Sequence, residues 1–425
     1  MASIIINELD RSVFLNRELT NNNIVLVTGS HMPSGTWKGG VFTPDETDTS
    51  APANKFVLCR SVEEFRSNFG SYPLTDNVGT DNVGWEYAIN IIKSGLPVLY
   101  YSYYKGIVVS EANLARAVNI AEDDIKLLYD KIYYKLKFIP LIYDNNPNQV
   151  DLLLLSDTRK DCITFVDYNE GTADPSDNKY TPLLAEAITG YSRAVVASPA
   201  ATYISPITNN INPKTQVAMK LTMPPSFWIL KTIAEGVANG TPVYSTWAGA
   251  KRGRITGVQE FTSKVSSQVM DEWTESLSII PLMNIPPYGD VIYGNSTRLN
   301  VGTIGEDGTI ETPSTRSALD SLNVISTINE ITYQIFEICL GLRFDTNDTI
   351  LWNEFRMKLG NVLDVMKSNR AINNYLIVMD NTIVTNDQVD ALTVPGIVMV
   401  DVGRAAEKFR IEFSITPSGA IFANL

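Results

Sequence analysis

The sequence predicts an α/β protein that continues into a smaller α+β unit, with strand-like segments at both ends of the chain. Three observations support this fold class. Strand-like and helix-like segments alternate through about the first 300 residues, which is the pattern of α/β proteins. A polar, turn-rich stretch follows at 300–315. Two amphipathic helices and three strands come after it, so we expect a domain boundary within this stretch.

The first elements follow this alternation closely. The apolar run at 24–28 predicts a buried strand, and the Gly/Pro/Ser/Thr/Asp-rich stretch at 29–54 predicts a long loop. A second strand is expected at Phe56–Cys59. Ser61 with Glu64 three residues later is the pattern that begins a helix. We expect this helix to end at Gly70, a further helix to end before Gly95, and a strand to follow at Val98–Tyr103.

The middle of the chain continues in the same style. We expect buried strands within 135–144, 162–168 and 193–204, and helices within 181–192 and 226–240. Asp123 and Asp124 are placed at the start of a further helix, where the helix dipole favours carboxylates. The segment "GEDGTIE" at 305–311 predicts a hairpin turn, because it does not match a calcium-binding loop.

The segment after 315 has the periodicity of two helices. Apolar residues recur at helical spacing within 323–342 and again within 347–368, where Asn347 or Asp348 caps the helix. Strands are expected at 374–380, 396–402 and 408–416. The apolar positions are Val324, Ile328, Ile331, Ile335 and Ile338 in the first helix, and Leu351, Phe355, Leu359, Val362 and Met366 in the second.

Both ends of the chain carry apolar, strand-like segments, although chain ends usually fray. Residues 408–416 alternate strictly between apolar and polar side chains, which is the pattern of a half-buried strand. The apolar residues of these terminal segments are Ile4, Ile5 and Ile6 at the start, and Phe409, Ile411, Phe413, Ile415, Ile421 and Phe422 at the end.

Composition excludes several classes of function. The net charge of −13 argues against a nucleic-acid-binding protein, which needs a basic face. No apolar run reaches the roughly 20 residues of a membrane span, and no basic stretch precedes the apolar start as in a secretory signal. The three cysteines, Cys59, Cys162 and Cys339, are odd in number and far apart, which favours buried thiols in a reducing compartment.

A search for catalytic or metal-binding patterns finds none that is convincing. His31 is the one histidine, Asp10 is the only aspartate that precedes it, and no nucleophile motif follows. The sequence has neither paired zinc ligands nor a phosphate-binding glycine loop, so we expect no cofactor and no metal. The one concentrated basic segment, at 247–254, has two open interpretations: a grip for an acidic partner through Lys251, Arg252 and Arg254, or a solvated loop.

Several stretches together resemble the tail sheath proteins of contractile bacteriophages and related injection machines. Residues 54–70 and 87–101 are similar to the family's strand, "S-x-x-E-F-x-x-x-F-G", helix, Gly and strand. Residues 223–258 resemble its paired prolines, helix, Ala-Gly and Arg-Gly segment. Residues 282–299 resemble its "G-x-x-x-W-G-x-R-T-L" pattern, with Tyr293 in place of Trp. Residues 321–335, 344–363 and 402–416 resemble its C-terminal domain, although "NVIS" replaces "N-V-R-R" and Gly403 replaces a common Pro.

The resemblance implies four regions: an N-terminal arm at 1–20, a subtilisin-like α/β domain without a working triad at 21–310, an inner α+β domain facing the tail tube at 311–405, and a C-terminal strand and arm at 406–425. The arms would complete sheets between subunits by strand addition. Segments 16–23 and 402–406 would be hinges. Arg356 and Lys367, three helical turns apart, are candidate tube-facing residues, with a solvated helix face as the alternative.

The resemblance also implies a structural protein and not an enzyme. Such a protein polymerises around the tube, contracts to drive it through the host envelope, and is located in the virion tail after assembly in the bacterial cytoplasm. Its partners would be other copies, the tail tube protein, and baseplate and tail terminator proteins, without direct nucleic-acid contact or membrane insertion. Two alternatives stay open: an α/β enzyme with a pocket at the carboxyl ends of its strands, and an adhesin or capsid-type protein.

Overall fold

The structure is a computed structural model of the 425-residue chain. It describes residues 23–31, 35–38, 41–44, 56–69, 83–105, 122–141, 149–167, 193–204, 220–264, 273–275, 278–300, 303–304, 310–311, 317–380, 382–384 and 393–406. The expected helix at 181–192, the strand at 408–416 and both terminal arms lie outside these residues.

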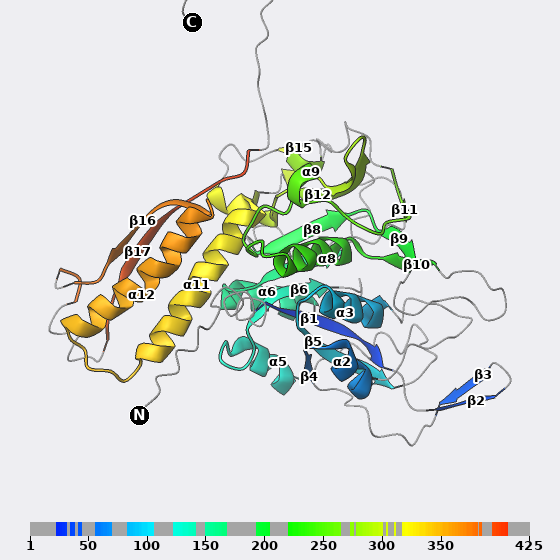
Figure 1. Cartoon of the computed structure of the whole chain (residues 1–425), viewed down its shortest axis with the longest axis horizontal. Helices are drawn as coiled ribbons and strands as arrows, with labels where there is room; N and C mark the ends of the chain where they lie inside the picture. Colours follow the sequence, from blue (N-terminus) through cyan, green and yellow to red (C-terminus); the bar gives the residue numbers. More distant parts are fainter. Residues whose placement is uncertain are drawn as a thin grey trace, which may run out of the picture.

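An eight-stranded sheet forms the centre of the molecule (Figure 1). The six inner strands, from β12 to β5, run parallel, and the edge strands β13 and β4 are antiparallel to their neighbours. In spatial order the strands are β13 (Gly289–Ile292), β12 (Ile279–Ile285), β8 (Ala194–Ser198), β7 (Ile163–Asp167), β6 (Leu136–Leu141), β1 (Ile24–His31), β5 (Val98–Lys105) and β4 (Phe56–Cys59).

Helices cover both faces of this sheet (Figure 1). The two-residue repeat of a strand divides its side chains between two cores, as β1 shows. Val25 and Val27 belong to the core that also contains residues of the helices α2 (Val62–Phe69), α3 (Val83–Lys93) and α8 (Pro225–Ala238). Ile24 and Leu26 face the opposite core, with α5 (Glu122–Tyr129) and α6 (Gln149–Arg159). Because both faces are buried, the inner strands are apolar on both sides.

Capping residues fix where two helices begin. Ser61 Oγ accepts a hydrogen bond from the Glu64 amide at 3.1 Å, which confirms the expected start of α2. Asp348 accepts hydrogen bonds from the first amides of α12 (Thr349–Ser368). Of the two candidate caps, Asp348 is therefore the one used. Asn347 instead accepts a hydrogen bond from the Trp352 indole at 2.9 Å.

The structure corrects one expectation and adds elements that the sequence analysis did not predict. The long loop at 29–54 is partly regular: β1 continues to His31, and a hairpin follows, formed by β2 (Gly35–Lys38) and β3 (Val41–Pro44). The turn at 305–311 is confirmed, since β14 (Thr303–Ile304) pairs with β15 (Ile310–Glu311). The additional elements are α6, β12, β13, the small sheet of β9 (Ala201–Ile204), β10 (Lys220–Met223) and β11 (Glu260–Phe261), the short helix α9 (Gly249–Arg252), and two 3₁₀ turns, η2 (Arg298–Asn300) and η3 (Ala318–Asp320).

A C-terminal unit lies beside the large sheet (Figure 1). It consists of the helices α11 (Leu322–Leu342) and α12, followed by the antiparallel strands β16 (Ile372–Val378) and β17 (Ile397–Val402). The two predicted helices and the first two predicted strands of this unit are confirmed. One apolar side of α12, with Phe355, Leu359 and Met366, is buried in the same core as α8.

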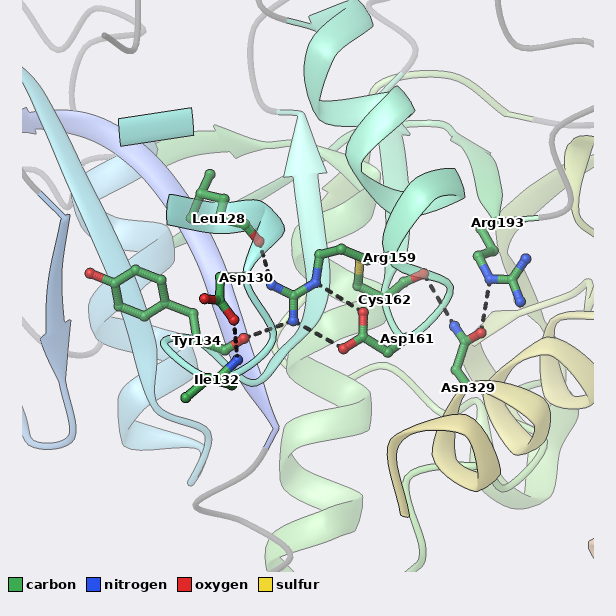
Figure 2. Close-up of polar contacts among 9 residues, drawn as sticks. All are labelled: Leu128, Asp130, Ile132, Tyr134, Arg159, Asp161, Cys162, Arg193 and Asn329. Carbon is green, nitrogen blue, oxygen red and sulfur yellow. Dashed lines mark hydrogen bonds and ion pairs between the residues drawn. The ribbon is translucent and has the colours of Figure 1, made fainter. Parts of the chain in front are cut away.

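Helix α11 is joined to the amino ends of three central strands by buried polar contacts. Lys137, near the start of β6, forms an ion pair with Glu330 at 2.6 Å, and both side chains are about 5% exposed. Asn329 donates to the carbonyl of Cys162, before β7, at 3.1 Å. It accepts from Arg193, before β8, at 3.0 Å (Figure 2). These contacts hold the C-terminal unit against the end of the sheet at which these three strands begin.

Arg159 organises the loops beside this junction (Figure 2). Its guanidinium binds both carboxylate oxygens of Asp161, at 2.9 and 3.0 Å, and both side chains are fully buried. The same group donates to the carbonyls of Tyr134, at 2.7 Å, and of Leu128. One cation therefore links the end of α6 to the segment that leads from α5 into β6.

We predict that Arg159→Met lowers the free energy of unfolding by about 3–5 kcal/mol, because it leaves the Asp161 carboxylate buried without its cation. Urea unfolding followed by circular dichroism measures this change. Lys160→Met is the matched control, since Lys160 is exposed and adjacent. Equal stability of the two variants would contradict the role assigned to Arg159.

We predict that Glu330 makes the free energy of unfolding depend on pH in the acidic range. Burial alone would raise the pKa of Glu330, but the Lys137 charge and hydrogen bonds from Lys137 and Gln334 outweigh it, so the pKa lies below its ordinary value of 4.5. A lowered carboxyl pKa stabilises the fold above the unfolded pKa, and this stabilisation disappears as pH falls through the folded pKa.

Glu330→Gln should therefore lower the free energy of unfolding by about 3 kcal/mol at neutral pH, and the difference from the native chain should shrink below the ordinary carboxyl pKa. Urea unfolding across this pH range provides the measurement. The control is Glu354→Gln, in the exposed Glu354–Lys358 pair. A difference for Glu330→Gln that stays constant down to the acid limit would refute the assignment.

Candidate functional site

Polar side chains gather at the carboxyl end of β7, where an α/β enzyme would place its chemistry. Asp167 ends this strand and accepts hydrogen bonds from the amide of Ser226 at 2.7 Å and from its hydroxyl at 2.5 Å. The Tyr87 hydroxyl lies 3.2 Å from the Ser226 hydroxyl. All three residues are buried, and Asp167 sits at the amino end of α8, whose dipole favours a carboxylate. The cluster therefore anchors a helix.

We next consider the other candidates for catalysis and metal binding among the described residues. His31, the one histidine that a catalytic triad could use, is the final residue of β1. No group of three or more His, Cys, Asp or Glu side chains suited to a metal ion occurs in the part of the chain that the structure describes. Within the same part, none of the helices combines the length and the apolar character that a membrane span needs.

The strand pair β16–β17 is the candidate functional site. Six residue pairs join its strands, from Ile372 opposite Val402 to Val378 opposite Ile397. Neither strand pairs with a third strand among the described residues, so each leaves one edge of the ribbon open. Unpaired backbone groups along such an edge can accept a further strand. We call this pair the open ribbon.

The two faces of the open ribbon differ. Tyr375, Ile377, Val398 and Val400 point inward and pack against the core. The outer face carries apolar side chains that remain exposed: Leu376 is 53% exposed and lies directly opposite Met399, which is 55% exposed. At the other end of the ribbon the outer face is polar, with Asn374 opposite Asp401.

The two candidate tube-facing residues both lie beside β16. Lys367 Nζ is 3.4 Å from the side-chain oxygen of Asn374, near the start of the strand. At the far end, hydrogen bonds from Thr382 and the charge of Arg356 lower the pKa of Asp380. Arg356 and Lys367 are both exposed on α12. Their contact with a tube stays a prediction.

At the β13 edge of the large sheet, another segment of the chain covers the edge strand. The segment 253–255 lies against β13, with hydrogen bonds from the Ile255 amide to Asp290 at 2.8 Å and from the Ile292 amide to Gly253 at 2.8 Å. Gly253 is required here, because a Cβ atom would lie 2.7 Å from Cα of Ala248. The basic residues of the stretch 247–254, which are Lys251, Arg252 and Arg254, are exposed.

The predicted arm residues belong to the two ends of the chain. Ile4, Ile5, Ile6, Phe409, Ile411, Phe413, Ile415, Ile421 and Phe422 lie outside the described residues. The sequence analysis predicted donated strands at the chain ends and named no surface that would accept them. The segments at 374–380 and 396–402 are apolar on both faces, which a two-stranded ribbon with one covered face does not need.

Of the comparisons with known proteins, the one with solved structures finds matches. No family model matches the sequence, and no curated protein does. The chain is similar to a chain of the anti-feeding prophage baseplate, with a TM-score of 0.61, 13% identity, and 93% of this chain and 94% of that chain covered.

Two further solved structures extend the likeness. The contracted sheath complex of an extracellular contractile injection system, named PVC, gives a TM-score of 0.59, 14% identity and 97% coverage of both chains. A sheath tail protein of Listeria innocua gives 0.52, with 10% identity, covering 93% of this chain and 97% of that chain. The resemblance noted in the sequence is confirmed at the level of structure: this mixed α/β chain has the fold of contractile-system sheath proteins.

Proposed function

We propose that this chain polymerises as a helical sheath around a tail tube, and that the sheath contracts to drive the tube through a host envelope. The observation that carries this proposal is the likeness to sheath structures over more than nine tenths of both chains. The extent of the match supports a sheath function, because an enzyme that shared only one domain with these proteins would match over that domain alone.

Subunits are linked by exchanged terminal strands. The open ribbon leaves backbone donors and acceptors unpaired, and the strand-like segments at 4–6 and 408–416 can fill them. Each backbone hydrogen bond contributes a net 0.5–1.5 kcal/mol or so, and each buried Ile or Phe about 1.5–3 kcal/mol. A donated strand thus contributes on the order of 10 kcal/mol before its ordering entropy is subtracted.

Such a contact is heterologous, since the arm of one copy binds a different surface on the next. Heterologous contacts close into rings or continue as helices, and a sheath needs both stacking and winding. During contraction the domains move as rigid bodies and the arms keep the copies connected. The hinge segments are 16–23 and 402–406, the second of which leaves the end of β17.

The finer parts of the proposal follow from the same resemblance. The α/β domain at 21–310 is subtilisin-like without catalysis, and the unit at 311–405 faces the tube. The arms are 1–20 and 406–425. The partners are other copies, the tube protein, the baseplate and a tail terminator protein, and the assembly belongs to a tail formed in the bacterial cytoplasm. Packing of Asp167, Ser226 and Tyr87 inside the core supports a structural role over the alternative of an α/β enzyme.

We expect that deleting residues 1–8 or residues 417–425 leaves a folded monomer that no longer polymerises, because each deletion removes a donated strand. Sedimentation velocity and negative-stain electron microscopy measure assembly, and circular dichroism checks the fold. A chain with Lys160→Met, at an exposed residue, is the assembly control. Normal tubes from either truncated chain would refute the arm model.

We expect that Arg356→Glu combined with Lys367→Glu reduces retention of extended sheath on tubes, by several-fold at low salt, because acidic groups on the tube would be repelled. Co-sedimentation of sheath with purified tubes gives the bound fraction. Lys358→Glu, on another side of α12, is the control. If the double variant stays on tubes as well as the control does, the α12 face is not the tube contact.

A further inference from the structure

Three exposed cations lie together on the segment that covers β13. Lys251 and Arg252 are the last two residues of α9, and Arg254 follows after Gly253. None of the three side chains forms an ion pair or a hydrogen bond with another described residue. We call Lys251, Arg252 and Arg254 the cationic patch.

The carboxylates near the cationic patch have partners of their own. Glu235, on α8, pairs with Lys231 at 2.8 Å, and Asp290, on β13, accepts a hydrogen bond from the Asn284 amide at 2.8 Å. Glu260 belongs to β11, which pairs with β9 in the small sheet. Even with the Asp290 carboxylate counted, the patch keeps an excess of positive charge, although the whole chain has a net charge of −13.

The backbone that carries the cationic patch is anchored on both sides. Before the patch, Trp247 is buried and its indole donates to a backbone carbonyl at 2.8 Å. After it, the Ile255 amide donates to the Asp290 carbonyl at 2.8 Å. A Cβ atom on Gly289 would lie 3.9 Å from the Arg254 guanidinium, which places this group at the turn between β12 and β13. An anchored backbone loses less entropy on binding than a solvated loop does, which favours a binding role.

Exposed tyrosines lie next to the same anchored segment. Tyr288, in the turn between β12 and β13, is 55% exposed, and Tyr293, directly after β13, is 40% exposed. Arginine and tyrosine are enriched where proteins bind one another, and both are frequent among the residues that contribute most to binding. The cationic patch and these tyrosines therefore have the composition of a protein-binding surface for an acidic partner.

The chain itself contains an acidic run that has the matching charge. Asp45, Glu46 and Asp48 occupy three of the four positions at 45–48, and no Lys, Arg or His occurs within 39–54. This run follows directly after Pro44, the last residue of β3. We call residues 45–48 the acidic run. The other acidic stretch, at 305–311, follows soon after β13 and so belongs to the same part of the chain as the patch's own edge strand.

The acidic run and the cationic patch belong to opposite sides of one subunit. The β2–β3 hairpin, which precedes the run, projects from the body on the side away from α9 (Figure 1). Residues 253–255 lie outside β13, eight strand spacings or about 38 Å from β4 at the other edge of the sheet. The chain from Asp48 to Phe56, the first residue of β4, spans at most about 29 Å. Asp48 therefore does not reach the patch of its own copy.

We propose that the cationic patch binds the acidic run of another copy, as a polar contact separate from the terminal arms. Complementary surfaces on opposite sides of a subunit form a heterologous contact, which a helical polymer can repeat. The proposal rests on the proposed sheath function and adds to it a second pair of matching surfaces. Because the contact joins exposed charges, salt weakens it.

Carbodiimide crosslinking of native polymers tests which residues meet. The reagent joins a lysine amine to a carboxylate without a spacer, with loss of water, so it requires direct contact. Polymers are formed without tubes from a mixture of ¹⁵N-labelled and unlabelled chains, and crosslinked peptides are identified by mass spectrometry. We expect Lys251 to be joined to Asp45, Glu46 or Asp48, in peptide pairs that combine a labelled and an unlabelled chain.

Crosslinks of Lys251 to 305–311 in place of the acidic run, or crosslinks to the run within one chain alone, overturn the proposal. Tubes in which Lys251 forms no crosslink to the acidic run also overturn it and leave the sheath function standing. A native chain that never polymerises removes the sheath function and this proposal together.

A charge exchange tests the recognition with a second readout. Lys251→Glu combined with Arg252→Glu should raise the protein concentration needed for polymerisation without tubes by about tenfold at low salt, because the acidic run is then repelled. Asp45→Lys combined with Glu46→Lys should have a similar effect. All four substitutions together should return the concentration to within about twofold of the native value.

Lys93→Glu combined with Lys160→Glu is the matched control for this exchange. Both lysines are exposed and lie outside the patch, and the pair changes the net charge by the same amount. We expect this control to polymerise as the native chain does, and circular dichroism verifies that each variant folds. An equal loss in the control, or no restoration when the two reversals are combined, overturns the proposal.

Discussion

The buried contact between α11 and the amino ends of β6, β7 and β8 holds the molecule together as one body. Lys137 and Glu330 form an ion pair in the interior, where the loss of either partner leaves an unpaired charge. Asn329 adds contacts to the two neighbouring strand starts. Polar contacts of this kind have defined geometry, so they set the position of α11 more strictly than apolar packing alone.

The position of α11 in turn determines where the open ribbon lies. Helix α12 packs on α11, and β16 runs back along α12, so the ribbon is carried on a rigid pair of helices. Its inner face packs against this support, and Leu376 and Met399 on its outer face are exposed.

The buried polar groups of the α/β body serve packing. Arg159 satisfies two backbone carbonyls and one carboxylate, and Asp167 satisfies the first turn of α8. In a doubly covered parallel sheet, side chains at the strand ends often bind ligands. Here, Ser226 donates hydrogen bonds to both oxygens of Asp167, and the ring of Tyr87 packs against that of Phe227.

The sequence by itself determined the local elements whose periodicity is strong: five of the six inner strands, all but β12, together with α2, α8, both helices of the C-terminal unit and the Ser61 cap. It also indicated the unusual apolar chain ends. It did not reveal α6, whose apolar residues form a run without clear helical spacing, or the hairpin hidden in a glycine-rich loop. Only the tertiary structure decided that Lys137 meets Glu330, that Lys367 lies beside Asn374, and that β16 pairs with β17 alone among the described residues. These facts depend on contacts between residues distant in sequence, which local periodicity does not encode, because it records which face of an element is buried and not what buries it.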